Sequence, residues 1–206
     1  MANKVFISFR FSDGNKYKKE LEELFSDVDD VINCSEDKDR SNMTDETIKK
    51  YLYEKLKNTS VTIVLLTPHS ISHQKLRNGK YDDWMYDEIR YSLEDREWNR
   101  CNGLIAVYVP DAEQSIRSAS TCTKCGQNCK TSVIYNFDNL VRKNMMNVRD
   151  DYKKNPCDGI YDLTDDSYCT LVSLEEFKKH YADYIQNADK KRHETYKYDI
   201  RKDLNK

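Results

Sequence analysis

The chain has 206 residues, of which 34% are charged, and its formal net charge is −2 at pH 7. This length fits one domain or a compact core with an added part, and the near-neutral charge gives no general attraction to nucleic acid or membranes. No apolar run could span a bilayer, no signal-peptide core follows Met1, and the cysteines are odd in number, so we expect a soluble cytoplasmic protein with reduced thiols.

Short apolar stretches alternate with helical patterns over the first 110 residues. The predicted elements are a strand at 4–9, a loop at 10–15, a helix at 15–26, a strand within 28–34, a loop at 35–43, a helix at 44–57, a strand at 61–66, a loop at 67–80, a helix from 82 to about 98 and a strand at 104–109. This alternation predicts a parallel sheet with helices on both faces, a three-layer, flavodoxin-like α/β fold.

In such sheets, ligands bind beyond the carboxyl ends of the strands. That rim should be built from residues 9–14, 33–43 and 67–83, together with the start of the helix from residue 82. The apolar stripe of this helix consists of Met85, Ile89 and Leu93. The adjacent face consists of Tyr81, Trp84, Glu88 and Tyr91. A carboxylate between aromatic rings at the edge of the core is desolvated, which makes Glu88 a candidate for chemistry; the alternative is an ordinary solvated helix residue.

The second half of the chain is less regular. We expect a loop at 112–132, a strand and a helix within 133–148, a strand at 169–174 and then an amphipathic helix that a capping box of Ser173 and Glu176 begins. The predicted domain covers residues 1–188, with a core at 1–110 and an elaboration at 111–188. Residues 189–206 are highly charged and are interpreted as a charged C-terminal tail, either a solvated helix end or a frayed tail.

Several common functional motifs are missing. The five glycines form neither a dinucleotide-binding fingerprint nor a phosphate-binding P-loop, and no serine nucleophile elbow is present. Cys122, Cys125 and Cys129 are a weak zinc candidate, for which Cys157, Cys169 or a histidine could supply a fourth ligand. Unliganded thiols in a loop are the favoured interpretation. His69 and His73 lack a matching carboxylate pattern, so we interpret them as surface or rim residues.

Three features are recognisable together: KVFISFR in the first strand, W-x-x-x-E at Trp84 and Glu88, and the order of the strands between them. In these respects the chain resembles a TIR domain, and most closely the TIR-like proteins of bacterial Thoeris anti-phage systems. The resemblance covers about the first 110 residues. It implies an NAD nucleosidase or ADP-ribosyl cyclase, a glycosidic-bond hydrolase whose cyclic or linear ADP-ribose product signals in antiviral defence.

The resemblance also assigns site residues. Glu88 matches the catalytic glutamate, Phe9 and Arg10 match positions that line the nucleotide pocket, and Trp84 matches the aromatic residue one turn before the glutamate. Asn33 and Ser35 lie where the BB loop of the family begins. Core packing remains the alternative role for Trp84, and an ordinary surface position remains the alternative for Arg10.

The implied partners follow from the same resemblance. NAD+ is a substrate, and neither a cofactor nor a metal is required. The nucleotide product would activate an effector protein, with TIR self-assembly and a phage-derived trigger as further possibilities, and without nucleic acid or a membrane. The alternative function is a non-catalytic module that acts by TIR–TIR assembly.

Overall fold

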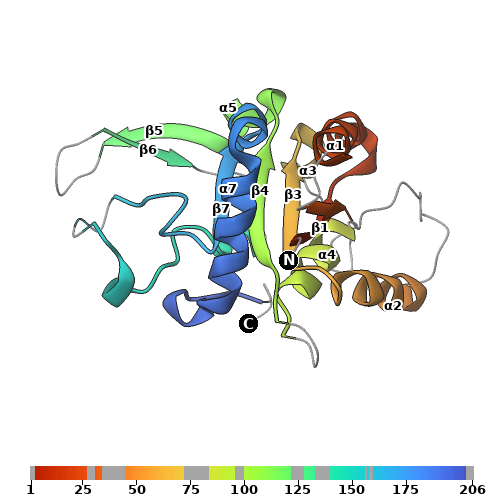
Figure 1. Cartoon of the computed structure of the whole chain (residues 1–206). Helices are drawn as coiled ribbons and strands as arrows, with labels where there is room; N and C mark the ends of the chain where they lie inside the picture. The colour runs from red at the N-terminus through yellow and green to blue at the C-terminus, as the bar shows by residue number, and fades with distance from the viewer. Residues whose placement is uncertain are drawn as a thin grey trace.

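The computed structural model of the protein describes residues 3–26, 31–33, 45–71, 84–95, 100–121, 128–132, 140–155, 157 and 160–202. Its centre is a five-stranded sheet with helices on both faces (Figure 1). The strands, in spatial order, are β2 (Val31–Asn33), β1 (Asn3–Ser8), β3 (Val61–Leu66), β4 (Gly103–Tyr108) and β7 (Cys169–Ser173). All neighbouring pairs run parallel, which confirms the predicted flavodoxin-like α/β fold.

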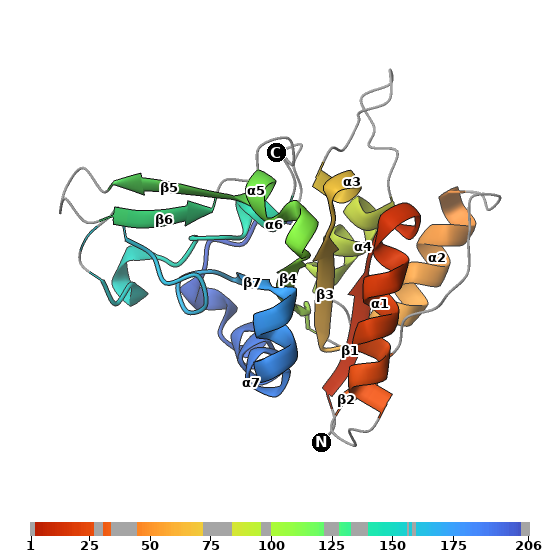
Figure 2. The same cartoon turned by 90° about the horizontal axis from the view of Figure 1, so that it is seen from above.

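The helices form the two outer layers (Figure 2). One face of the sheet is covered by α1 (Phe11–Ser26) and α7 (Leu174–His193). The other face carries α4 (Trp84–Ser92), with α2 (Asp45–Leu56) and α6 (Leu140–Lys143) packed beside it. A short helix, α3 (Pro68–Ile71), follows the carboxyl end of β3. Among the described residues, no helix is long and apolar enough to cross a bilayer.

Alternation along β1 sends its side chains to different layers. Val5 and Ile7 belong to the main core, which also contains Leu21 of α1, whereas Phe6 packs with Leu52 and Leu56 of α2. The next strands, β3 and β4, are buried at every position, as their uniformly apolar sequences predict. Side chains at even positions of β1 therefore point toward the layer that contains α4.

Two predicted helix boundaries are wrong. The first helix begins at Phe11 and includes most of the predicted loop 10–15, because Gly14 continues the helix and donates from its backbone nitrogen to Arg10 O at 2.8 Å. The helix that carries Glu88 ends at Ser92 instead of reaching residue 98. Its end is fixed by the Asn102 backbone nitrogen, which donates to Ser92 O at 2.6 Å.

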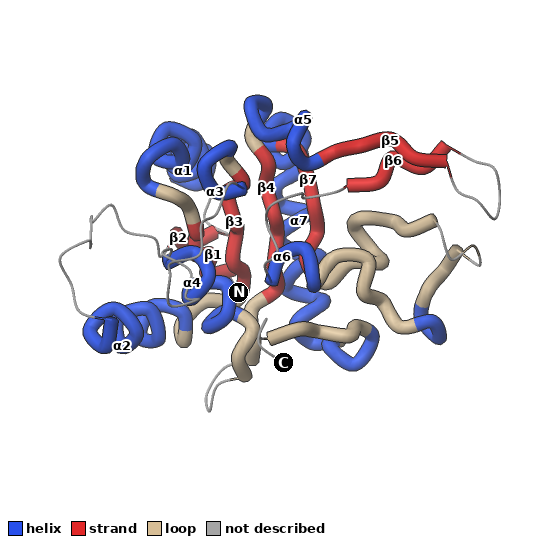
Figure 3. The backbone as a smooth tube through the Cα atoms, turned by 180° about the vertical axis from the view of Figure 1, so that it is seen from behind, coloured by secondary structure: helices blue, strands red, loops and turns tan. Residues whose placement is uncertain are grey.

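The predicted loop at 112–132 is also wrong. The chain forms a 3-10 turn at Pro110–Ala112, α5 (Glu113–Ile116), and an antiparallel hairpin of β5 (Arg117–Thr121) and β6 (Asn128–Ser132). The hairpin extends away from the central sheet (Figure 3). Its strands are rich in serine and threonine and lack apolar alternation, so the pattern that marks a half-buried strand is missing from the sequence.

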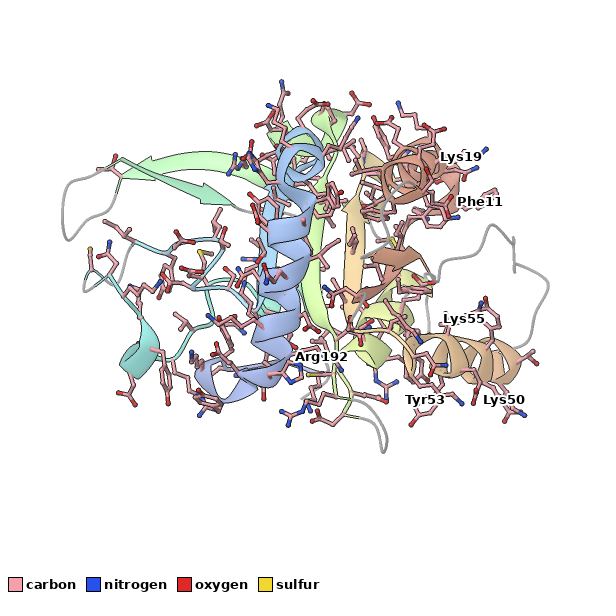
Figure 4. All side chains as sticks on the ribbon, in the orientation of Figure 1. Phe11, Lys19, Lys50, Tyr53, Lys55 and Arg192 are labelled. Atoms are coloured by element: carbon pink, nitrogen blue, oxygen red, sulfur yellow. The ribbon has the colours of Figure 1, made fainter. Side chains whose placement is uncertain are left out.

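The last part of the chain packs against the domain. The N-cap half of the predicted capping box is confirmed, since the Glu176 backbone nitrogen donates to Ser173 Oγ at 3.2 Å. Helix α7 continues through the start of the charged segment to His193, but the predicted solvation is wrong for Lys191 and Arg192, which are buried; Arg192 Nε donates to Cys101 O at 3.1 Å (Figure 4). Further 3-10 turns lie at Asp150–Tyr152 and Thr195–Lys197. Of the predicted strand and helix within 133–148, α6 supplies the helix, and residues 133–139 lie outside the described ranges.

Candidate functional site

Glu88 lies in the second turn of α4, at the boundary between core and solvent. The stripe on the helix is confirmed, because Met85, Ile89 and Leu93 are all buried. Glu88 itself is half-buried. Burial raises the pKa of the Tyr91 hydroxyl on the same helix, and the Asp87 carboxylate raises it further. The Tyr91 hydroxyl on this helix is therefore partly shielded from water.

The Glu88 carboxylate touches the carboxyl end of the first strand. Ser8, the last residue of β1, is 0% exposed and donates a hydrogen bond from Oγ to Glu88 Oε2 at 2.6 Å. Such a short O–H···O distance is typical of a hydrogen bond to an ionised carboxylate. Ser8 and Phe6 share one face of β1, so strand alternation directs the hydroxyl toward the helix layer that contains Glu88.

A chain of buried hydrogen bonds fixes the backbone of α4 on the sheet. Ser92 Oγ donates to Glu88 O at 2.8 Å, and the hydroxyls of Ser92 and Thr62 lie 2.7 Å apart. Asn102 Nδ2 donates to Thr62 Oγ1 at 3.0 Å and to Thr59 Oγ1 at 2.7 Å. Because the Ser92 proton is used by the helix carbonyl, the Thr62 hydroxyl is the donor to Ser92. The helix that carries the carboxylate is thus held in one position on β3.

The next two residues after Ser8 point elsewhere. The Phe9 ring packs on α1, where a Cβ added to Gly14 would lie 3.3 Å from Phe9 Cδ2 and where Lys18 Nζ is 5.6 Å from the ring centroid. Arg10 reaches toward α3 and donates from Nη1 to His69 O at 3.1 Å. Phe9 therefore lies on the α1 side of β1, whereas Ser8 contacts α4, and Arg10 lies at the rim beyond the strand ends.

The Asp13 carboxylate on α1 joins two segments of the rim through hydrogen bonds. Asp13 accepts hydrogen bonds from Thr67 Oγ1 and from the His69 backbone nitrogen, both at 2.9 Å. Asp13 is in the first turn of α1, where the helix dipole also favours a negative charge. These bonds tie the first turn of α1 to Thr67 and the start of α3, on either side of the position where the strand order reverses.

A cavity of about 390 Å³ opens at this rim. It is lined by Ser12, Asp13, Asn15, Lys16, Tyr17, Pro68, His69 and Asp111. Tyr17 donates from its hydroxyl to Asp111 Oδ2 at 3.2 Å, and Asn15 Oδ1 is buried without a hydrogen-bond donor within the described part of the chain. Phe11 stands exposed at the start of α1 (Figure 4). Among the described residues, Glu88 is not part of the lining of this cavity.

The other predicted site residues are described less fully. Trp84 begins α4 and Asn33 ends β2, but their side chains lie outside what the structure describes, and Ser35 is outside entirely. His69 is exposed at the rim, as predicted, and His73 falls outside the described ranges. Of the predicted rim residues, the structure therefore brings Arg10 and His69 together.

The proposed zinc ligands fall mostly outside the described residues. Cys122 and Cys125 are not described, and Cys129 is described only as backbone in β6. Cys157 is half-buried, whereas Cys169 is fully buried in β7, where burial raises the pKa of its thiol to about 12. Across the described ranges, no three His, Cys, Asp or Glu side chains are grouped as metal ligands.

Two residues of this rim are absent from the sequence-based site. Ser8 was part of an apolar strand pattern, although its place on the Phe6 face and at the last strand position marks a small polar side chain aimed at a helix at the ligand rim. Asp13 was part of a predicted loop, and its role in joining α1 to α3 depends on contacts more than 50 residues apart along the chain.

Most of the elements that build this rim lie in the part of the chain that matches a known protein family. A family model described as "Thoeris protein ThsB, TIR-like domain" matches residues 6–114, which is more than half of the chain. The matched range contains the end of β1, the rim residues Arg10 and Asp13, the whole of α4 and strand β4.

Proposed function

Because the chain belongs to the TIR-like domain family of the Thoeris protein ThsB, we propose that it cleaves NAD+ between nicotinamide and ribose. Family membership supports a role in anti-phage defence. The observation that carries the catalytic proposal is the position of Glu88: its carboxylate is half-buried at the carboxyl end of β1, where a parallel sheet binds ligands, and it accepts a hydrogen bond from Ser8.

One carboxylate is enough for this reaction. The bond between the ribose carbon and the pyridinium nitrogen breaks with its electron pair moving to nitrogen, so nicotinamide leaves as a neutral molecule and needs no proton. Water, or a nucleophile within the same molecule, then bonds to the sugar carbon and loses a proton. The two-carboxylate arrangement of ordinary O-glycosidases is not required. Glu88 stabilises the positive charge that develops on the ribose, and a partly dry site strengthens that attraction.

The remaining rim residues suit the rest of a dinucleotide. Arg10 presents a guanidinium at the rim, and guanidinium groups match the geometry of phosphate oxygens. Phe9 and Trp84 are the candidates to wall in the rings, although Phe9 packs toward α1. In this proposal NAD+ is a substrate, the protein holds no resident cofactor, and the ADP-ribose-derived product activates a defence effector.

The test is nicotinamide release from NAD+ by purified protein, with Glu88→Gln as the diagnostic variant. Glutamine keeps the shape of the side chain and removes its charge. Glu94→Gln is the matched control, because Glu94 directly follows the same helix, pairs with Arg90 and lies one and a half turns from Glu88. We expect Glu88→Gln to lose at least about 100-fold in kcat, and Glu94→Gln to keep activity near that of the wild type.

Equal turnover by wild type and Glu88→Gln would remove Glu88 from the reaction. Since TIR enzymes can require infection or assembly, the same pair is also compared in cells exposed to phage, with the nucleotide products identified by mass spectrometry. A protein that protects cells equally well with Glu88→Gln, and forms no ADP-ribose product, would instead act as a non-catalytic TIR interaction module.

A further inference from the structure

We propose that Ser8 is a positioning residue for the reaction: its hydroxyl holds one oxygen of the Glu88 carboxylate, so that the other oxygen faces the sugar. This inference rests on the proposed function. Its basis is the contact between Ser8 Oγ and Glu88 Oε2 at 2.6 Å, which joins two residues that are 80 positions apart in the sequence.

Ser8 is a rigid donor. Its backbone is the last member of β1 and lies in register with Val64 of β3, and its side chain is 0% exposed. A buried hydroxyl behind the carboxylate cannot reach a substrate in the rim, so Ser8 acts through Glu88. A serine hydroxyl has one proton to donate, and this proton is directed to Oε2.

Separate contacts hold the helix and its carboxylate. The chain from Asn102 through Thr62 to Ser92 ends on the backbone oxygen of Glu88, so it fixes α4 and does not involve the Glu88 carboxylate. The bond to Ser8 selects one rotamer of that side chain. It also favours the ionised carboxylate, because Ser8 donates to the charged form, and this opposes the effect of partial burial.

The test compares Ser8→Ala with Ser167→Ala. Both substitutions remove a fully buried hydroxyl, but Ser167 Oγ accepts from the Met146 backbone nitrogen, in the segment before β7 and away from the rim. We expect Ser8→Ala to lower kcat roughly 10- to 100-fold with little change in KM, because a hydrogen bond to a charged group is lost while the substrate contacts remain. Ser167→Ala should lose stability but keep the kcat of the wild type.

A second measurement does not depend on activity. The carboxyl carbon of Glu88 is titrated by NMR in protein with isotope-labelled glutamate, and its midpoint should rise by about one to two pH units in Ser8→Ala. All variants keep the same charged groups on and around α4, so the difference reports Ser8. These groups are Asp87, Arg90 and Glu94 at α4, Arg10 after β1, Glu54 and Lys55 on α2, and Arg142 and Lys143 on α6.

The outcomes separate the two proposals. A wild-type enzyme that depends on Glu88, together with an equally active Ser8→Ala whose Glu88 titrates as in the wild type, would overturn the role of Ser8. A wild type without NAD cleavage, in vitro and in infected cells, would overturn the proposed function and with it any catalytic role of Ser8. In that case a raised midpoint in Ser8→Ala would still identify the hydrogen bond to the ionised carboxylate.

Discussion

Three consecutive residues at the end of β1 make three different contacts. Ser8 contacts Glu88 on α4, Phe9 packs on α1, and Arg10 bonds to His69 after β3. Strand alternation sets the first two directions, and the third belongs to the turn into α1. The order of these three residues therefore determines which helix each side chain contacts. A shift by one residue would exchange the polar and aromatic side chains between the two faces of the sheet.

At the same scale, Arg10→Ala should weaken substrate binding. We expect KM for NAD+ to rise roughly 10- to 100-fold with a smaller change in kcat, because a charged contact to the diphosphate is lost in both the ground state and the transition state. Lys19→Ala is the control for net charge, since Lys19 is exposed on the outer side of α1 (Figure 4). A kcat loss without a change in KM would contradict a binding role.

The two described glycines with close neighbours should respond differently to alanine. A Cβ at Gly103 would lie 2.0 Å from the backbone oxygen of Ala188, so Gly103→Ala should cost at least about 3 kcal/mol of unfolding free energy. A Cβ at Gly14 would lie 3.2 Å from Phe9 Cβ, inside a helix that favours alanine. We therefore expect Gly14→Ala to stay within about 1 kcal/mol of the wild type in urea unfolding. Equal losses in both variants would show that α7 shifts to accept the new methyl group.

Among the elements, α7 is held at its far end by a buried cation. Lys191 Nζ donates to Thr164 O, to Ser167 O at 2.7 Å and to Thr170 Oγ1 at 2.7 Å. Burial lowers the pKa of Lys191 to about 8, while the charges of Cys169, Asp165, Asp162 and Asp166 raise it and oppose that decrease. One ammonium group thus joins the end of α7 to the turn before β7 and to β7 itself.

The substitution Lys191→Met tests whether the contacts of the Lys191 ammonium group stabilise the protein. Methionine fills a similar volume but leaves three buried oxygens without their donor, so we expect a loss of about 2–4 kcal/mol in unfolding free energy. Lys190→Met is the matched control, because Lys190 is the exposed neighbour on the same turn, and it should change stability by less than about 0.5 kcal/mol. Similar values for both variants would mean that the ammonium contacts contribute no net stability.

At the scale of the whole molecule, the burial of the Cys169 thiol in the core lowers the free energy of unfolding at alkaline pH. The Cys169 thiol ionises near pH 9.0 when unperturbed, but burial raises its pKa in the folded protein to about 12. Between these values the unfolded state binds fewer protons, so stability present below pH 9.0 is lost as the pH rises toward about 12. The slope from this one group is at most about 1.4 kcal/mol per pH unit.

Cys169→Ala removes that slope. We expect the difference in unfolding free energy between the variant and the wild type to be constant below about pH 9 and then to move in favour of the variant as the pH rises. Urea unfolding at a series of pH values measures this difference directly. Parallel pH profiles for the two proteins would mean that the thiol does not contribute to the alkaline loss of stability.

The sequence predicts the strands of the central sheet well, but it predicts the first and last residues of the helices less well. The apolar runs of β3 and β4 and the Ser173 N-cap of α7 depend on local patterns, and the structure confirms all of them. The hairpin was missed because its strands are polar, and the start of α1 was missed because Gly14 in a polar stretch is typical of a loop. The burial of Lys191 was missed because charged runs are usually solvated, whether they form a helix end or a tail.

For the site, the sequence predicts that Glu88 lies beside an apolar stripe at the ligand rim, and the structure places it there, next to Ser8. The contact between Ser8 and Glu88 could not be predicted from local patterns, because it depends on how β1 and α4 meet across the fold. The catalytic roles of Glu88, Phe9, Arg10, Asn33, Ser35 and Trp84 remain predictions. Periodicity predicts which face of an element is buried but not which residue of another element it meets.

The position of β7 matters for any shortened protein that contains only the residues matched by the family model. The family match ends at residue 114, whereas β7 pairs along the outer side of β4, and α7 covers Gly103. A fragment that ends at residue 114 would leave the backbone N–H and C=O groups along the outer edge of β4 unpaired. Because β4 is apolar, this exposed edge would favour strand pairing between copies of the fragment. Residues 169–193 lie outside the family match, yet they cover the outer edge of β4 and should be kept in any shortened protein.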